Sequence, residues 1–167
     1  PLQDAILAGA AISLVLYCAQ AARDARLIAL TRVDDGWRTG TPPEQLPGEA
    51  VTVLHYSGVA LFAEVPRIAE SWPRVGDDTT RPVVIVSVRA LPDVPSATVE
   101  KLLRAQAERI RERGGRFILA GVSANLRRSI TRAGLADAIG EENIFVADDR
   151  VLGALDRAYD DAVRWLG

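Results

Sequence analysis

The sequence has very few of the residues on which disulfide frameworks and metal sites depend. Its 167 residues include one cysteine, Cys18, one histidine, His55, and no methionine. A lone cysteine excludes an intramolecular disulfide and fits a reducing compartment. His55 has no acidic or thiol partner at metal-ligand spacing, so we interpret it as a structural residue. The net charge of −2 gives no sign of a nucleic-acid surface, and none is expected.

Charge is also missing from residues 5–22, AILAGAAISLVLYCAQAA, which form an 18-residue apolar run near the start of the chain. This length is at the lower edge of what spans a bilayer. Arg23, Arg26 and Arg32 follow the run, and the positive-inside rule then predicts a cytoplasmic position for the downstream chain. The run is preceded by Asp4 and not by a basic region, so we do not interpret the run as a signal peptide. The alternative is a buried, alanine-rich helix of a soluble protein.

The chain starts at Pro1, so we expect either a trimmed initiator or a piece of a longer protein. We divide it into three parts. Residues 1–31 are interpreted as the end of a membrane helix with a juxtamembrane extension, and residues 51–167 as a compact domain. Residues 32–50 between them are predicted to be a linker, because residues 37–49 are rich in proline, glycine and threonine and show no periodicity.

The compact domain is organised around residues 81–122. Residues 83–88 are apolar and rich in β-branched side chains, which predicts a strand buried on both faces. A proline-punctuated loop follows, and Ser96 then caps a helix that ends at Gly114-Gly115. Residues 117–120 start the next strand. A strand, a crossover helix and a second strand predict a right-handed βαβ unit with parallel strands.

The same criteria predict the other elements of the domain. They are strands at 51–56, 59–65 and 144–146, and helices after Pro66, Ser123 and either Asp148 or Asp149. The expected fold class is therefore α/β: a mixed, largely parallel sheet flanked by helices, in the order β-β-α-β-α-β-α-β-α, behind a hydrophobic N-terminal helix.

This order, with the motifs that fill it, resembles the STAS domain, which anti-sigma-factor antagonists share with the cytoplasmic tails of SulP anion transporters. Residues 58–63, GVALFA, look like the family's Gly-x-Leu-Phe-Phe-Ala strand, and residues 113–122 look like its Arg-Gly-x-x-Leu-x-Leu-x-Gly-Val strand. Residues 133–145 are similar to the SulP version in particular. The start of the chain looks like the last transmembrane helix of a SulP transporter, and the domain resemblance runs from Val51 to about Trp165.

The family's signature loop is altered in this chain. STAS domains usually carry Asp-Ser-Ser-Gly or Asp-x-Thr-Gly here, and soluble regulators are phosphorylated on the serine after the aspartate. This chain has Pro95-Ser96-Ala97-Thr98. Anchoring the comparison on Pro92 aligns Ser96 with the phosphoacceptor, whereas anchoring it on Gly114 aligns Ser96 with the aspartate. Neither register gives an Asp-Ser pair, so we interpret Ser96 as a helix cap and keep Ser96 and Asp93 as candidate regulatory positions.

Four polar residues are expected near the carboxyl end of the parallel strands, where ligands often bind: Asp93, Ser96, Asp148 and Asp149. Helix caps and solvated turns explain all four. No second histidine, glycine-rich phosphate loop or nucleophile elbow accompanies them. We therefore expect no enzyme activity, no metal site and no cofactor. Nucleotide binding has been associated with STAS domains, but no residue here marks such a site, and calorimetry would test it.

Arg127, Arg128 and Arg132 form a basic stripe on the predicted helix after Ser123. Such a stripe is usually a solvated face, but this one could contact anionic headgroups or a partner.

The resemblance implies a cytoplasmic, regulatory and structural domain of a transporter for sulfate, bicarbonate or a small carboxylate in the plasma (inner) membrane. Its expected partners are the membrane part of the same transporter, a second copy and a cytoplasmic regulatory protein. Two alternatives stay open at this point. One is a soluble partner-switching regulator that resembles anti-sigma-factor antagonists, and the other is a flavodoxin-like enzyme.

Overall fold

The computed structural model describes residues 1–58 and 65–167, with only the backbone of residues 21–24. The described residues form a six-stranded sheet in the order β2-β1-β3-β4-β5-β6. The strands are β1 (Arg26–Val33), β2 (Gly36–Gly40), β3 (Val51–Ser57), β4 (Val83–Ser87), β5 (Arg116–Val122) and β6 (Ile144–Val146). Strands β3 to β6 are parallel, and β1 runs antiparallel to both of its neighbours. The mixed, largely parallel sheet is the fold class that the sequence predicts.

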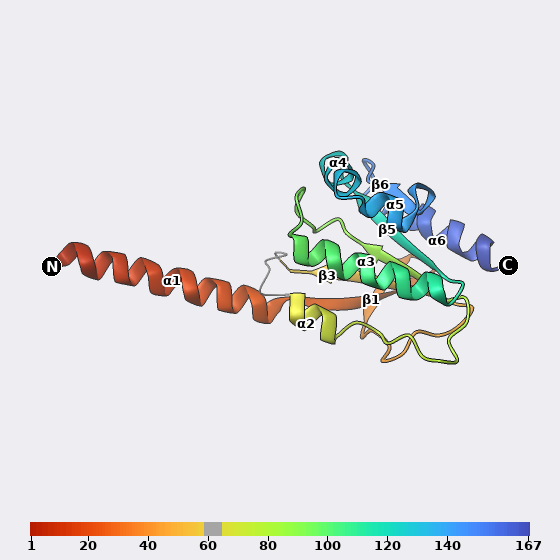
Figure 1. The fold of residues 1–167 in the computed structure, drawn as a ribbon, viewed down its shortest axis with the longest axis horizontal. Coiled ribbons are helices and arrows are strands. Elements are labelled where there is room, and N and C mark those ends of the chain that lie inside the picture. Colours follow the sequence, from red (N-terminus) through yellow and green to blue (C-terminus); the bar gives the residue numbers. More distant parts are fainter. Residues whose placement is uncertain (59–64) are drawn as a thin grey trace.

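Helices cover both faces of this sheet, as Figure 1 shows. The described helices are α1 (Leu2–Asp24), α2 (Val65–Glu70), α3 (Ala97–Glu112), α4 (Ala124–Arg132), α5 (Leu135–Ile139), the 3-10 turn η2 (Glu141–Asn143) and α6 (Gly153–Leu166), of which α1 does not cover the sheet. One core cluster packs α2 to α5 against the sheet through side chains such as Leu103, Ile110 and Leu126. A second, smaller cluster packs Leu155, Ala158 and Ala162 of α6 against the opposite face.

The central βαβ unit forms as its sequence predicts. All five residues of β4 are buried, because helices cover both faces of this strand. Ser96 caps α3 by accepting a hydrogen bond from the Val99 amide at 3.3 Å. The helix ends at the glycine pair: Gly114 has a φ of +69°, and a Cβ on Gly115 would lie 2.1 Å from the Pro82 carbonyl oxygen. Only glycine fits this close approach, so the pair fixes where β5 begins.

The structure differs from the linker expectation for residues 32–50. Strand β1 ends within this segment and β2 follows it, so the sheet begins at Arg26 and not at Val51, the predicted start of the domain. The Trp37 indole of β2 donates a hydrogen bond to Asp156 of α6 at 3.0 Å and packs edge-on against the Tyr159 ring. Farther along, Leu46 is only 2% exposed. This stretch is therefore packed into the domain.

Two other expectations need comment. The predicted strand at 59–65 lies outside the described residues except for Val65, which begins α2. The prediction that Asp148 or Asp149 caps the last helix is wrong, because α6 begins at Gly153 and has no side-chain cap. Asp148 instead accepts hydrogen bonds from the Arg157 side chain and, at 3.1 Å, from the Arg150 amide. The carboxylate thus connects the loop that precedes α6 to Arg157 on that helix.

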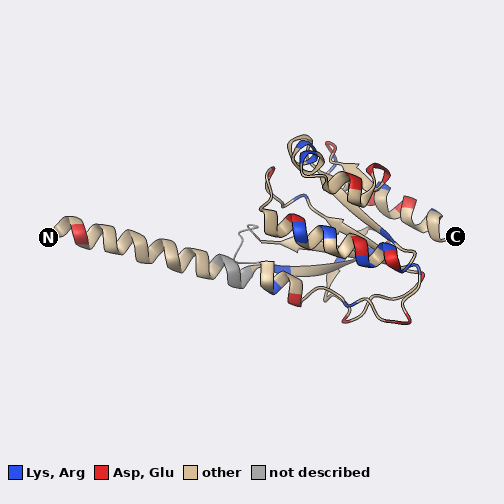
Figure 2. Ribbon diagram, viewed as in Figure 1, with Lys and Arg blue, Asp and Glu red and all other residues tan. Residues whose placement is uncertain are grey.

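Helix α1 extends away from the sheet as a rod (Figure 1). Its segment Leu2–Gln20 has a mean hydropathy of 1.7 and is 0% buried, which among the described helices gives one candidate membrane span by length and composition. In Figure 2 one charged residue is coloured on α1 ahead of the grey segment, and it lies close to the N-terminal end of the helix. At the other end Ala25 is only 1% exposed, so α1 passes into β1 through one buried residue.

We predict that Trp37→Ala lowers the free energy of unfolding by about 2 kcal/mol, because it removes a partly buried ring and leaves Asp156 with one donor fewer. Arg38→Ala on the same strand is the control, since this side chain is exposed. Urea unfolding of the chain in detergent micelles measures both. Equal stability of the two variants would mean that the β1–β2 hairpin does not support the fold.

Candidate functional site

The loops that follow β4 and β5 meet at the carboxyl edge of the parallel sheet. Ser87 at the end of β4 is in register with Ala120 near the end of β5, so the two loops leave the sheet side by side. Asp93 in the first loop accepts hydrogen bonds from the Ser123 hydroxyl at 2.7 Å and from the Asn125 side-chain amide at 2.8 Å. Of the residues expected together here, the structure thus brings Asp93 to α4 and does not join it to Asp148 or Asp149.

This contact holds a negative charge at the amino end of α4. The Ser123 hydroxyl also accepts from the Leu126 amide at 3.0 Å, so one side chain both caps α4 and binds Asp93. Arg128 donates to the Asn125 side-chain oxygen and adds positive charge nearby. The hydrogen bonds from Asn125 and Ser123 lower the pKa of Asp93, and Arg128 adds a smaller effect in the same direction. The loop is therefore fastened to α4 by an ionised carboxylate.

Ser96 has a different role from Asp93. Its hydroxyl accepts from Val99 and belongs to the cap of α3, and its side chain is partly buried. Among the described residues no hydrogen bond joins Ser96 to Asp93. The cap interpretation of Ser96 accounts for its position.

The three arginines of the basic stripe lie on the exposed side of α4, where Figure 2 shows a cluster of basic residues. Arg127 forms an ion pair with Glu141 at 3.0 Å, and Arg132 donates to the backbone carbonyl of Arg128 at 3.3 Å. With Arg128 bound to Asn125, each guanidinium has an internal partner. Exposed pairs of this kind hold side chains weakly, so the stripe stays open to an external anion.

His55 lies on β3 beside the same edge. Its Nδ1 is 3.1 Å from the Ser87 hydroxyl oxygen, and burial lowers the pKa of the imidazole. The described residues contain no group of three or more histidine, cysteine, aspartate or glutamate side chains that could hold a metal ion. The interpretation of His55 as a structural residue accounts for these contacts.

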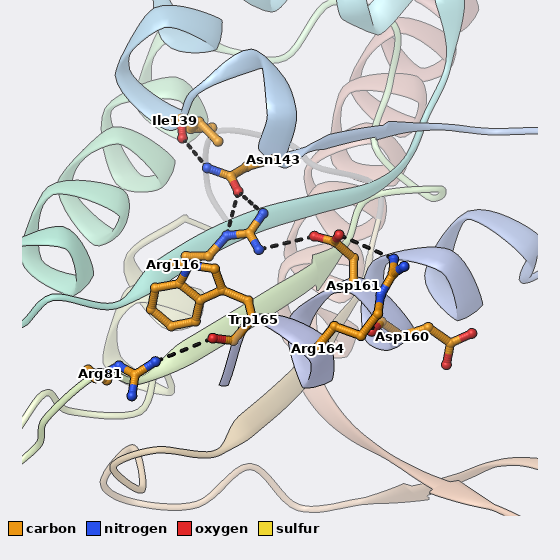
Figure 3. Close-up of polar contacts among 8 residues, drawn as sticks. All are labelled: Arg81, Arg116, Ile139, Asn143, Asp160, Asp161, Arg164 and Trp165. Carbon is orange, nitrogen blue, oxygen red and sulfur yellow. Dashed lines mark hydrogen bonds and ion pairs between the residues drawn. The ribbon is translucent and has the colours of Figure 1, made fainter. Parts of the chain in front are cut away.

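A polar cluster at the opposite, amino edge of the sheet was not found from the sequence (Figure 3). Arg116, whose side chain is 14% exposed, forms an ion pair with Asp161 at 3.0 Å and donates twice to the Asn143 side-chain oxygen, at 2.9 and 2.6 Å. Asn143 in turn donates to the Ile139 carbonyl at 2.8 Å. The guanidinium also lies 5.6 Å from the centre of the Trp165 ring. The cluster ties β5, η2 and α6 together.

Beside this cluster is a cleft of about 620 Å³, bordered by Arg111, Asp137 and Glu142. The guanidinium of Arg116, which lines the cleft, already has protein partners, and both acidic and basic side chains border the cleft. This arrangement fits a structural role, in which the polar contacts hold β5, η2 and α6 together. Arg111 also lines the cleft and is exposed, but the guanidinium at its centre, that of Arg116, is bound by Asp161 and Asn143. No sequence signal marks it, because the partners of Arg116 lie 27 and 45 residues further along the chain.

Comparisons with known proteins agree with the fold. A family model described as STAS domain matches residues 44–149. No curated protein matches. A sulfate transporter family protein from Wolinella succinogenes is 29% identical, with a TM-score of 0.56 over 72% of this chain and 89% of that protein. The murine anion transporter Slc26a9 in its inward-facing state is 15% identical, with a TM-score of 0.67 over 93% of this chain. A second structure of SLC26A9 is 14% identical, with a TM-score of 0.61 over 94% of this chain.

At such low identities the two SLC26A9 structures show a shared fold alone. This chain spans 25% and 27% of their lengths. The family model begins at residue 44 and therefore leaves β1 and β2 outside its match, although both strands belong to the sheet.

We predict that Asp161→Ala lowers the free energy of unfolding by about 1–2 kcal/mol, because it removes the carboxylate partner of the largely buried Arg116. Asp160→Ala is the matched control: Figure 3 shows its carboxylate pointing away from Arg116, and the substitution keeps its backbone carbonyl, to which Arg164 donates. Arg164 also donates to the Asp161 carboxylate at 3.4 Å, an exposed contact that Asp161→Ala removes together with the Arg116 pair. Chemical denaturation compares the two. Similar losses in both variants would mean that Arg116 does not depend on Asp161.

We also predict the pH dependence of the Asp93 contact. Because the folded chain lowers the pKa of Asp93 below its ordinary value of 3.8, the stabilisation is fully present above that value and is lost as the pH falls through the lowered pKa. Hydrogen exchange of residues 89–95 should therefore accelerate only at the acid end. Asp93→Asn should exchange fast at every pH. A loop in the wild type that already loosens well above the ordinary pKa of an aspartate would contradict this assignment.

Proposed function

The chain belongs to the STAS domain family, and we propose that it is the cytoplasmic regulatory and structural domain of a SulP-type anion transporter, attached to the end of the last membrane helix. The observation that carries the proposal is the apolar, solvent-exposed α1, joined to a STAS fold through one buried residue. A water-soluble domain has no physical reason to hold a mostly apolar helical segment of 19 residues in solvent.

The structural comparison with murine Slc26a9 supports this arrangement. It covers 93% of this chain, and α1 has 23 of the 167 residues, so the uncovered remainder is shorter than α1. The likeness therefore includes at least part of α1. In our proposal the membrane segment ends near the end of α1, and the cytoplasmic domain begins at β1 and not at residue 51. Arg26 and Arg32 on β1 would lie on the cytoplasmic side, as the positive-inside rule requires.

The transported anion in this proposal is sulfate, bicarbonate or a small carboxylate, and its binding site lies in a membrane part outside residues 1–167. The proposed domain is not catalytic and holds no cofactor. Its partners would be that membrane part, a second copy and a cytoplasmic regulatory protein. The names of the Wolinella protein, a sulfate transporter family member, and of Slc26a9, an anion transporter, support the substrate class.

The competing function is a soluble regulator switched by phosphorylation. Such a switch needs an accessible serine beside an aspartate at the start of α3. Here the residue before Ser96 is Pro95, and the Ser96 hydroxyl is used to cap the helix. The basic stripe on α4 is a candidate surface for a contact with anionic headgroups or with a partner protein. Changing its three arginines to glutamate would then weaken membrane or partner association.

The test is made on the native protein. We expect an antibody to residues 51–167 to detect a band far larger than 18.0 kDa that resists alkaline carbonate extraction from membranes. Cells that express the full-length protein should then take up labelled sulfate, bicarbonate or a small carboxylate. A soluble band near 18.0 kDa would rule out the transporter. An integral protein that moves none of the tested anions would leave the membrane position standing and refute the substrate class.

A further inference from the structure

A second cleft lies directly at the point where α1 joins the domain. It has a volume of about 560 Å³, and two arginines line it, Arg26 at the start of β1 and Arg67 on α2. Thr41 and Ser57 also line it, together with the buried Ala25. Ser71 lines the cleft as well, but its hydroxyl donates to the Ile68 carbonyl. The two guanidinium groups and the hydroxyls of Thr41 and Ser57 are left as donors that suit an oxyanion.

Neither arginine side chain has a partner among the residues that the structure describes. Within residues 1–58 and 65–167 neither the Arg26 nor the Arg67 guanidinium forms a hydrogen bond or an ion pair, and both side chains are exposed. By contrast, Arg32, Arg113, Arg116, Arg127 and Arg157 each bind a carboxylate. Glu70 is the acidic residue that shares α2 with Arg67, and no ion pair joins them. The cleft therefore presents two positive charges that the described residues do not neutralise.

Strand pairing puts this cleft at the membrane side of the domain. Arg26 pairs with Ser57 at the carboxyl end of β3, so α1 leaves from the carboxyl edge of the sheet. The apolar span ends at Gln20, and a helical rise of 1.5 Å per residue puts Ala25 at most about 8 Å beyond it. The headgroup layer on each side of a bilayer is about 5–8 Å deep. The cleft then opens at the depth of the lipid phosphates.

We propose that this cleft binds the headgroup of an anionic phospholipid of the membrane that α1 crosses. The proposal rests on the proposed function, because it needs α1 in the bilayer. Arg26 and Arg67 hold the phosphate by charge-assisted hydrogen bonds, and the hydroxyl groups of Thr41 and Ser57 contact its remaining oxygens or the polar headgroup. The acyl chains lie along the apolar surface of α1. A lipid bound in this way fixes the angle between α1 and the sheet.

The test uses the full chain in detergent micelles and three probes. Short-chain phosphatidylglycerol is the anionic lipid, the matching phosphatidylcholine is the neutral lipid, and inorganic phosphate is the free anion. Titration calorimetry should detect binding of phosphatidylglycerol and much weaker binding of the other two. Each arginine near a membrane surface contributes about 1 kcal/mol, so Arg26→Gln/Arg67→Gln should weaken phosphatidylglycerol binding about thirtyfold.

The control is Arg38→Gln/Arg109→Gln, which removes the same charge from two exposed arginines away from the cleft and should bind phosphatidylglycerol as the wild type does. Circular dichroism checks that both double variants fold. If Arg26→Gln/Arg67→Gln does not fold, each single variant is tested in its place and should bind phosphatidylglycerol about fivefold more weakly than the wild type. Equal binding of the two lipids, or an equal loss in the control, would overturn the proposal. Phosphate that binds as tightly as phosphatidylglycerol would assign the cleft to a soluble anion instead.

Carbonate extraction of the same variants separates this proposal from the proposed function. If α1 is not in the membrane, the wild type and both variants are extracted alike, and the transporter assignment fails. If α1 is in the membrane and the cleft does not bind phosphatidylglycerol, all three resist extraction and only the lipid site fails.

Discussion

The antiparallel pairing of β1 with β3 is the constraint on which the position of the whole domain depends. Because Arg26 pairs with Ser57, the strand that follows α1 starts at the carboxyl edge of the sheet, and the single buried residue Ala25 leaves no slack between helix and strand. With α1 in a bilayer, as we propose, the loops after β4 and β5 face the membrane, and the amino edge faces the cytoplasm. A longer connection would permit many orientations.

Residues with a strong local pattern could be assigned from the sequence, and those stabilised by distant partners could not. The βαβ unit was predictable because β4 is apolar on both faces and because Ser96 and Gly114-Gly115 mark the two ends of α3. Strand β2 was missed because it is short and carries glycine at both ends. Its stability comes from contacts of Trp37 with α6, such as the hydrogen bond to Asp156, and those partners lie far along the chain. Residues 37–49 lacked periodicity for the same reason.

The candidate sites follow the same rule. The sequence could identify Asp93 and Ser96 as polar residues near the carboxyl edge, because parallel strands end on one side of a sheet. It could not choose their partners. Asp93 binds Ser123 and Asn125, which lie 30 and 32 residues away, and the Arg116 cluster joins residues from three elements. Pairings at such separations are fixed by packing, and an isolated arginine or asparagine in a sequence carries no mark of them.

The arginines at the two edges of the sheet differ in their partners, and this difference indicates a structural role at the amino edge and a binding role at the carboxyl edge. At the amino edge Arg116 is largely buried and has acidic and amide partners, so its charge serves to join β5 to α6. At the carboxyl edge Arg26 and Arg67 are exposed beside an open cleft, with no such partner in the described part of the chain. In our proposal the bilayer around α1 supplies an anionic headgroup at the depth of this cleft.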